Sequence, residues 1–385
     1  MKLSRLRSTS LVLVLAGVSL PSVGQAEVLF EENFDRQEDW HSGLEVNATS
    51  RSPAGLPDRV QAERLGHTVP RGWDSAYQDP SWAPSVGFPD GHETIEILGI
   101  NTDKARGGAG KSFVQRRDSR PDPGHYWSSD GQLLKYFPAG HEGLYVEFWM
   151  KFEPDWSHHP SGDASKIFRV GSWSGQGSEF QAFSGGEQGP LFLWGWLRDS
   201  YGVRNFHSLR GGPHGENYGM TSETRGSHQR ESLNYTTDTV GHGVNGTTPK
   251  IPDRVNGGYI SDNLSQIVDH PQIFGTGEWN KVAFYVQMNS SPGVPDGVLR
   301  QWLNDEQIVN VRDIIWVSPS TEDPGKMVQW NFFSIGGNDY FKSYPMESQH
   351  QEWFAIDDLR VADQVPEYLE LGLSPPNPPG DVELY

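Results

Sequence analysis

Apolar and polar residues alternate along two stretches of the chain, and this alternation predicts β-strands with one face on a core. In the stretch 142–152 the apolar face consists of Leu144, Val146, Phe148, Met150 and Phe152. In the stretch 279–289 it consists of Val282, Phe284, Val286 and Met288. Each stretch is therefore expected to form a strand that lies with one side against the interior.

A Pro- and Gly-rich turn at 291–297 follows the second stretch and predicts a β-hairpin. Beyond the turn, Leu299, Gln301 and Leu303 alternate with larger polar and aromatic residues. The face of this hairpin that points away from the core then carries Lys281, Tyr285, Gln287, Arg300 and Trp302. We interpret that face as the floor of a binding groove.

Other segments complete an all-β pattern. Residues 28–35 and 353–361 are predicted as the first and last strands, lying side by side. Residues 190–198 are apolar on both faces, which fits either a strand buried on both sides or one whose Trp194 and Trp196 line a sugar groove. With 44 Gly, 27 Pro and 45 aromatic residues (14 Trp, 13 Tyr, 18 Phe), the chain is expected to form one loop-rich β-sandwich.

The beginning of the chain has the pattern of a secretory signal. Basic residues come first, an apolar run follows at 11–20, and the small residues Gly24 and Ala26 precede the expected cut. The predicted organisation is a signal peptide at 1–26, a single domain at 27–373 and a Pro-rich tail at 374–385. Residues 201–270 show no period and are interpreted as a long loop insertion, a rim or a lid. We expect a secreted or periplasmic protein.

Net charge and cysteine content exclude some classes of binding partner and some chemistry. The formal net charge is −19, and removing the predicted signal makes it more negative. This balance argues against nucleic acid and anionic membranes as partners. The apolar run at 11–20 is shorter than the roughly 20 residues of a membrane span, so we expect no membrane insertion, and we expect a monomer. With no Cys there is no disulfide and no thiolate nucleophile. A local Arg and Lys cluster still leaves room for an anionic polysaccharide.

Acidic residues gather at the ends of the first and last predicted strands. Carboxylate and amide oxygens are the ligands that Ca²⁺ prefers. The candidate ligands are Glu31, Asn33, Asp35, Asp357 and Asp358. The alternative interpretation is ordinary acids at strand ends, with no metal.

The order of several motifs resembles polysaccharide lyase family fourteen, alginate and glucuronate lyases with a concanavalin-like β-jelly roll. The motifs are LYVEFWMKF at 144–152, SKIFRVG at 165–171, the hairpin with its PGVPDGVLRQW segment at 277–309, NFFSIGGND at 331–339 and FAIDDLRV at 354–361. The match is best over 142–363. The resemblance implies a jelly-roll sandwich and β-elimination on a uronic-acid polymer, with no cofactor required for catalysis.

By the same resemblance, Lys166 corresponds to the family's catalytic Lys, whereas Phe192 and Trp194 stand where the family has Ser and Arg. β-Elimination needs a base, an acid and cations or amides that neutralise the sugar carboxylate. The predicted catalytic residues are Lys166, Arg198, His207, Tyr285 and Arg300. The predicted substrate-binding residues are Trp149, Trp194, Trp196, Lys281, Gln287 and Trp302. We expect all of them to line one groove.

Each of these predicted roles has a non-catalytic alternative. Tyr285 and Lys281 fit a solvated sheet face equally well, and His207 fits a loop histidine with a local hydrogen bond. A non-catalytic carbohydrate-binding protein with a Trp-lined groove is the alternative function, favoured by the missing family residues. Retaining hydrolysis is disfavoured because Glu93 and Glu96 do not match the E-x-D-x-x-E spacing of paired carboxylates.

Overall fold

A computed structural model describes most of the region predicted as the folded domain. It describes residues 26–42, 69–78, 94–118, 127–154, 156, 163–176, 188–199, 202–213, 235–238, 277–320, 322–340 and 351–373. The predicted signal before residue 26, the tail after 373 and most of the interval 201–270 lie outside the described residues.

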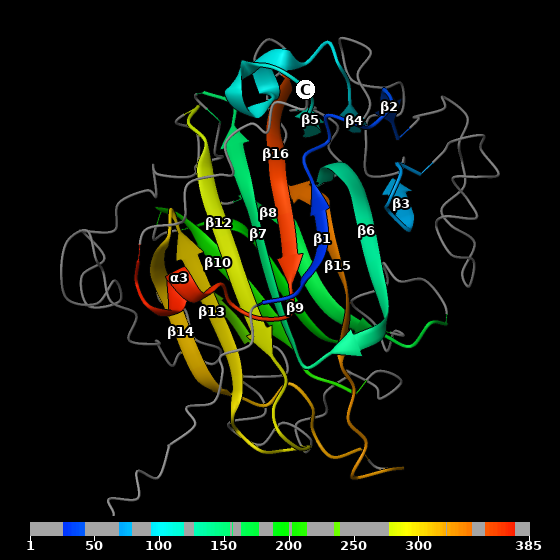
Figure 1. The fold of residues 1–385 in the computed structure, drawn as a ribbon, viewed down its shortest axis with the longest axis vertical. Coiled ribbons are helices and arrows are strands. Elements are labelled where there is room, and N and C mark those ends of the chain that lie inside the picture. The colour runs from blue at the N-terminus through cyan, green and yellow to red at the C-terminus, as the bar shows by residue number, and fades with distance from the viewer. Residues whose placement is uncertain are drawn as a thin grey trace, which may run out of the picture.

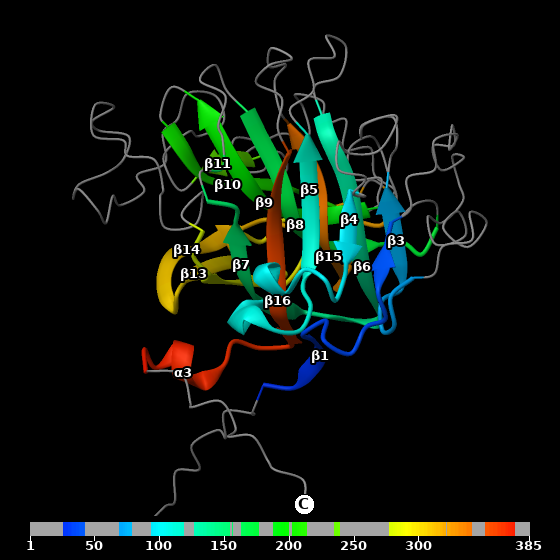
Figure 2. The ribbon, with the colours of Figure 1, turned by 90° about the horizontal axis from the view of Figure 1, so that it is seen from above.

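Two antiparallel sheets pack face to face as a sandwich (Figures 1 and 2). Sheet A has nine strands within the described residues, and β1 pairs with one side of β16. In spatial order its strands are β14 (Glu306–Ile314), β13 (Gly297–Leu303), β12 (Asn280–Gln287), β7 (Gly143–Phe152), β16 (Gln351–Ala362), β5 (Phe113–Asp118), β4 (Ile95–Ile97) and β2 (Trp40–His41), with β1 at Val28–Glu32. The prediction of an all-β sandwich is confirmed.

Sheet B has seven strands within the described residues. In spatial order they are β11 (Tyr235–Asp238), β10 (Gly202–Arg210), β9 (Gln188–Asp199), β8 (Asp163–Trp173), β15 (Trp330–Tyr340), β6 (Trp127–His141) and β3 (Ser75–Gln78). The short helical elements are η1 (Thr102–Lys104), η2 (Arg106–Gly108) and α3 (Glu367–Glu370). Two strands, β10 and β11, fall inside the interval 201–270, so the prediction of a loop throughout that interval is wrong.

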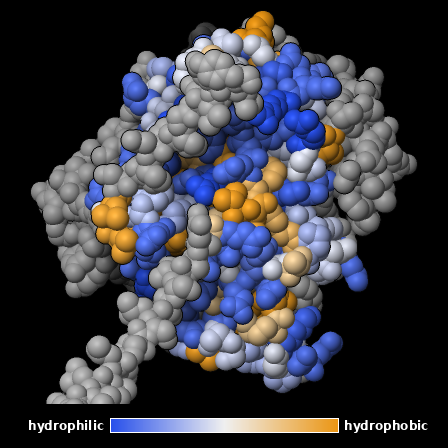
Figure 3. Space-filling model, viewed as in Figure 1, coloured by the Kyte–Doolittle hydropathy of each residue, from blue (hydrophilic) through white to orange (hydrophobic). Residues whose placement is uncertain are grey.

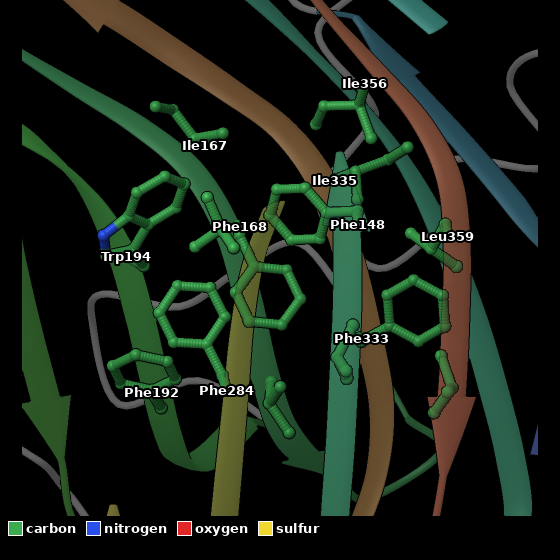
Figure 4. Close-up of a cluster of buried hydrophobic side chains, with 14 of the residues drawn as sticks. Phe148, Ile167, Phe168, Phe192, Trp194, Phe284, Phe333, Ile335, Ile356 and Leu359 are labelled. Carbon is green, nitrogen blue, oxygen red and sulfur yellow. The ribbon is translucent and has the colours of Figure 1, made fainter. Parts of the chain in front are cut away.

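Aromatic side chains from both sheets fill the space between them (Figure 4). Phe284 of sheet A lies against Phe168 of sheet B with ring centroids 5.0 Å apart and against Trp194 at 5.2 Å. The predicted inward faces of β7 and β12 are confirmed, because Phe148 and Val282 are fully buried in this core. Burying each such side chain contributes roughly 1.5–3 kcal/mol to folding.

The last strand changes partners along its length. The first half of β16 lies between β7 and β5, and its second half pairs with β1, as predicted for the first and last strands. A register shift falls between Asp357 and Arg360, where Asp358 takes a positive φ of 45°. Such a bulge bends the strand. Asp and Asn accept this left-handed conformation more readily than bulky residues.

The chain after β16 folds back over sheet A. Figure 2 shows α3 on the side of sheet A that faces away from sheet B. Val365 and Leu369 pack there on Tyr145 and Trp302, in a second apolar cluster outside the main core. The outer face of sheet A is therefore partly covered by the chain's own C-terminal segment.

Candidate functional site

Three of the predicted site residues meet on the outer face of sheet A. Tyr285 of β12 and Arg300 of β13 are register partners, and Gln287 is two residues along the same face. All three line a cavity of about 1260 Å³ between the sheet and the segment that contains α3. Figure 3 shows this face as hydrophilic surface broken by hydrophobic patches.

The electrostatics of this cavity do not favour Tyr285 as a base. Burial raises the pKa of Tyr285, and the opposing effect of Arg300 does not offset it. Arg300 itself is 6% exposed and forms an ion pair with Glu370 of α3. The Tyr285 hydroxyl is thus protonated at neutral pH, and a usable tyrosine base would need a lowered pKa.

Three other predicted residues of this sheet are held by protein contacts. Lys281 pairs with Asp305 and donates to the Tyr368 hydroxyl at 3.3 Å. Trp302 is 2% exposed, because Val365 and Leu369 cover it. The prediction that Trp302 stacks on sugars is therefore wrong in this arrangement. Trp149 is half-buried, and the Arg106 guanidinium lies 3.9 Å from its ring centroid.

Three further predicted residues lie between the sheets. Trp194 and Trp196 are fully buried on the inner face of β9, so the predicted stacking of sugars on them is wrong. Their strand is apolar on both faces because it is buried on both sides. His207 of β10 points inward beside Phe192, with ring centroids 5.5 Å apart, and is 1% exposed. Its Nε2 donates to Gln301 Oε1 at 2.7 Å. A groove role for His207 is contradicted by this placement.

His207 is expected to make stability fall in acid. Burial lowers its pKa from 6.5 to about 4, so between these values the unfolded chain binds a proton that the folded chain does not. The stabilisation is complete above about pH 6.5 and is lost as the pH falls towards 4, on the order of 3 kcal/mol in all. Urea unfolding at pH 4.5 and 7.5 measures the loss. His207→Gln should reduce it, and an unchanged acid loss in that variant would contradict the assignment.

Lys166 lies on the opposite surface, the outer face of sheet B. Lys166 pairs with Gly195 of β9, and the neighbours of Gly195, Trp194 and Trp196, point into the core. Lys166 therefore lies on the outward side, where it is half-buried. Arg198 ends the same strand opposite Asp163, but its side chain lies outside the described residues. The prediction of one shared groove is therefore wrong, because the candidates occupy two outer faces and the interior.

Beside Lys166, the outer face of sheet B carries a polar group that sequence reasoning missed. Arg169 pairs in register with Ser334 of β15, and the Ser334 hydroxyl donates to Gln132 Oε1 of β6 at 3.3 Å. Tyr77 of β3 is the register partner of Gln132. Arg169, Ser334 and Gln132 are each at most 3% exposed.

Aromatic and aliphatic side chains continue the same face. Leu134, Leu191 and Phe332 form a small apolar cluster there, with Tyr136 and Trp173 packed against it. Tyr136 and Trp173 are half-buried, and their ring centroids lie 5.2 Å apart. From Trp173 to Lys166 along β8 the face extends roughly 20 Å at about 3.3 Å per residue.

One signal for this face was present in the sequence. In SKIFRVG, Arg169 interrupts the apolar residues Phe168 and Val170, which marks the side of β8 that faces away from the core. Gln132, Ser334 and Tyr77 give no comparable signal, since they come from strands distant in sequence. We name the set Tyr77, Gln132, Tyr136, Lys166, Arg169, Trp173 and Ser334 the sheet B face.

The candidate calcium ligands have partners within the protein. Asp357 accepts backbone N–H groups of Arg106 and Asp358, each at 2.8 Å, and Asp358 pairs with the Arg106 side chain. Asp35 accepts the Lys111 N–H at 2.9 Å. Across the described ranges, no three His, Cys, Asp or Glu side chains are placed to hold a metal ion. The calcium site stays a prediction.

Two other candidate ligands, Glu31 and Asn33, also have partners within the protein. Glu31 pairs with Arg360 at 3.5 Å, and Asn33 donates to Asp35 Oδ2 at 3.4 Å. Burial raises the pKa of Asp357 to about 7, with Asp358 and Asp35 adding to the rise. These acids thus behave as strand-end and bulge residues held by N–H groups and cations.

Within the described part of the chain, no helix has the length and apolar character needed to cross a membrane. No protein-family profile matches the chain, and no curated protein does.

Solved structures give distant similarities. The endo-β-1,4-glucuronan lyase from the fungus Trichoderma reesei is 11% identical over 81% of this chain and 95% of its own, with a TM-score of 0.40. Alginate lyase Aly36B is 12% identical over 85% and 98%, with a TM-score of 0.33. The botulinum neurotoxin serotype C1 binding domain is 10% identical over 68% and 42%, with a TM-score of 0.32. At these values the similarities assign the chain to no family, and the functional assignment rests on its own side chains.

Proposed function

We propose that this protein binds a uronic-acid polysaccharide along the sheet B face and cleaves it by β-elimination. The observation that carries the proposal is the row of polar and half-buried aromatic side chains on the side of sheet B away from the core, in which Arg169 of β8 lies beside Ser334 of β15, and Ser334 bonds to Gln132 of β6. A guanidinium binds a carboxylate through two parallel hydrogen bonds, and an amide adds further polar contacts. Such a group suits a sugar that carries a carboxylate.

The reaction needs little beyond proton transfer and charge neutralisation. A base removes the proton at C5, the C4–O4 bond breaks, a C4=C5 double bond forms, and an acid returns a proton to O4. Negative charge builds up on the carboxylate as the C5 proton leaves. Donors already in place around that charge lower the barrier, because they need no reorganisation. In the proposal Arg169 and Gln132 hold the carboxylate.

Lys166 and Tyr77 are the proton-transfer candidates of the same face. Both are half-buried, and they lie on β8 and β3, the strands that flank β15 and β6. A Tyr next to cations can serve as a base when the phenolate is stabilised, and a Lys can return the proton. The position of Lys166 on the same face as Arg169 supports its predicted catalytic role.

The measurement that tests the function is direct. Mature protein is incubated with alginate, glucuronan and pectate, and the absorbance of the unsaturated uronate is followed. A rise that depends on Arg169 supports the proposal. No rise on any uronan, with retention of the protein on a uronan affinity gel, would replace it with the second candidate function.

That second candidate is a non-catalytic carbohydrate-binding protein, and the half-buried Trp173 and Tyr136 favour it. Sugar rings lie on exposed aromatic faces, which bury apolar area at little entropic cost. Trp173→Ala is expected to weaken retention on the polysaccharide gel about tenfold under either function. The matched control is Trp149→Ala on sheet A, which should retain normally. Equal retention of both variants would argue against sugar binding at this face.

We further propose that the protein acts after secretion, with the predicted signal removed. The support is the sequence pattern of residues 1–26. Sequencing the amino terminus of protein recovered outside the cytoplasm tests this directly.

A further inference from the structure

The position at which the predicted signal ends lies against the far end of the last strand. The backbone N–H of Glu27 donates to Asp363 Oδ1 at 2.8 Å. The N–H of Asp363 donates in return to the Glu27 carbonyl oxygen at 3.2 Å. These bonds continue the pairing of Val28 with Ala362 one residue beyond the β1–β16 ladder.

The sequence places the expected cleavage at the same bond. Gly24 and Ala26 are the small residues three and one positions before it. A signal peptidase would add water across the Ala26–Glu27 peptide bond, leaving a carboxylate on Ala26 and an amine on Glu27. That amine takes up a proton below its pKa, which is about 7.7–8.0 for a free α-amino group. The amide nitrogen that now faces Asp363 would then carry a positive charge.

We propose that cleavage after Ala26 places the new α-ammonium of Glu27 on the Asp363 carboxylate, so that processing creates an ion pair fastening β1 to the end of β16. The inference is independent of the lyase proposal and rests on the predicted signal. A charged donor strengthens a hydrogen bond that exists already in neutral form. No rearrangement of either strand is required, because donor and acceptor are already 2.8 Å apart.

The ion pair would act on a functional part of the fold. Asp363 leads directly into the segment with Val365 and Leu369 that covers Trp302. Ala26 and Asp363 both line the cavity that contains Tyr285 and Arg300. The ammonium is thus expected to hold one wall of that cavity in place, whereas an uncleaved chain has only the neutral hydrogen bond at that position.

The stabilisation by this ion pair depends on pH because the Glu27 amine must be protonated to form it. The carboxylate partner raises the pKa of the ammonium above that of a free α-amino group. The stabilisation is complete below about pH 7.7 and is lost as the pH rises through the raised value. The other charged or titratable groups that line this cavity are His141, Glu142, Tyr285, Arg300, Arg312, Arg360, Glu367, Tyr368 and Glu370. Burial raises the pKa of Tyr285, so its hydroxyl stays protonated where the ammonium titrates.

The test is a cycle of four full-domain proteins. One pair begins at Glu27 with a free amine, and the other carries an acetyl group on the same nitrogen. Each pair has Asp363 or Asp363→Asn, which keeps an oxygen acceptor but removes the charge. Urea unfolding is measured at pH 6 and at pH 10.5. At pH 6 the amine and Asp363 should be coupled by two- to fivefold in the unfolding equilibrium constant, as for other exposed pairs.

The coupling should fall towards one at pH 10.5, where the amine is neutral. Glu367→Gln is the matched control, since it removes an exposed carboxylate of the same cavity without touching Glu27. It should show no coupling with acetylation at either pH. Absence of coupling at pH 6, coupling of the same size at pH 10.5, or a secreted protein whose first residue is not Glu27 would each overturn the proposal.

Discussion

Arg169→Gln is expected to lower the rate of uronan cleavage by about a hundredfold or more. Removing one charge-stabilising donor from a preorganised site typically costs about 10²–10³ in turnover. Arg169 lies next to Ser334, is 3% exposed, and provides the guanidinium of the sheet B face. Gln keeps part of the volume and the hydrogen-bonding capacity of the side chain but removes the positive charge. The readout is the initial rise in unsaturated-uronate absorbance, with retention on the uronan gel measured in parallel.

Arg312→Gln is the matched control for this prediction. Arg312 is exposed on β14 of sheet A and lines the cavity on the other side of the molecule. Its loss should leave cleavage unchanged. Thermal unfolding of Arg169→Gln separates a lost fold from a lost site, and Arg169→Lys, which keeps the charge, should recover part of the rate. Full activity in a folded Arg169→Gln protein would exclude the sheet B face as the reaction site.

The largest effect on stability is expected from Arg117→Leu. Arg117 of β5 pairs with Glu352 of β16, with Nη2 and Oε2 2.6 Å apart and the two side chains only 1% and 6% exposed. Its guanidinium lies 3.6 Å from the ring centroid of Trp156 and faces the core. Removing Arg117 breaks this buried ion pair from one side, which typically costs about 3–5 kcal/mol. Urea unfolding at neutral pH measures the loss.

In that variant the nearby carboxylate of Glu153 would further destabilise a charged Glu352. Burial and the nearby Glu352 both raise the pKa of Glu153. Replacing both members of the pair, Arg117→Leu with Glu352→Leu, should recover most of the stability, since well-packed apolar residues often replace a buried ion pair without loss. A single variant as stable as the original protein, or a double variant no better than the single one, would show that the pair is not what stabilises this part of the core.

Local pattern was sufficient for the strands but not for the site. The inward faces of β7 and β12, the hairpin of β12 with β13, and the pairing of β1 with β16 all followed from residues close in sequence or at the two ends of the domain. The prediction of a shared groove failed because period two separates core side from outer side within one strand and does not say which sheet the strand joins. Tyr285 and Lys166 are both outward residues, yet of different sheets.

His207 and Trp302 show the other limit. His207 lies in a stretch without clear hydrophobic period, and only its pairing with Trp194 of β9 fixes its side chain inside. Trp302 points outward, as predicted, and becomes buried only because Leu369 folds back over it. Contacts of this kind join residues far apart in sequence, so neither strand propensity nor the alternation of apolar and polar residues predicts them.

The sequence by itself determined that this chain forms an all-β sandwich and which side chains of β7 and β12 face the core. The tertiary structure alone decided that Arg169, Ser334, Gln132 and Tyr77 share one face, and that the acids of β16 are held by Arg106. The physical reason is the sequence separation of the residues that must interact. The face of a strand is set by the alternation of neighbouring residues, whereas a site is set by which strands pair and in what register.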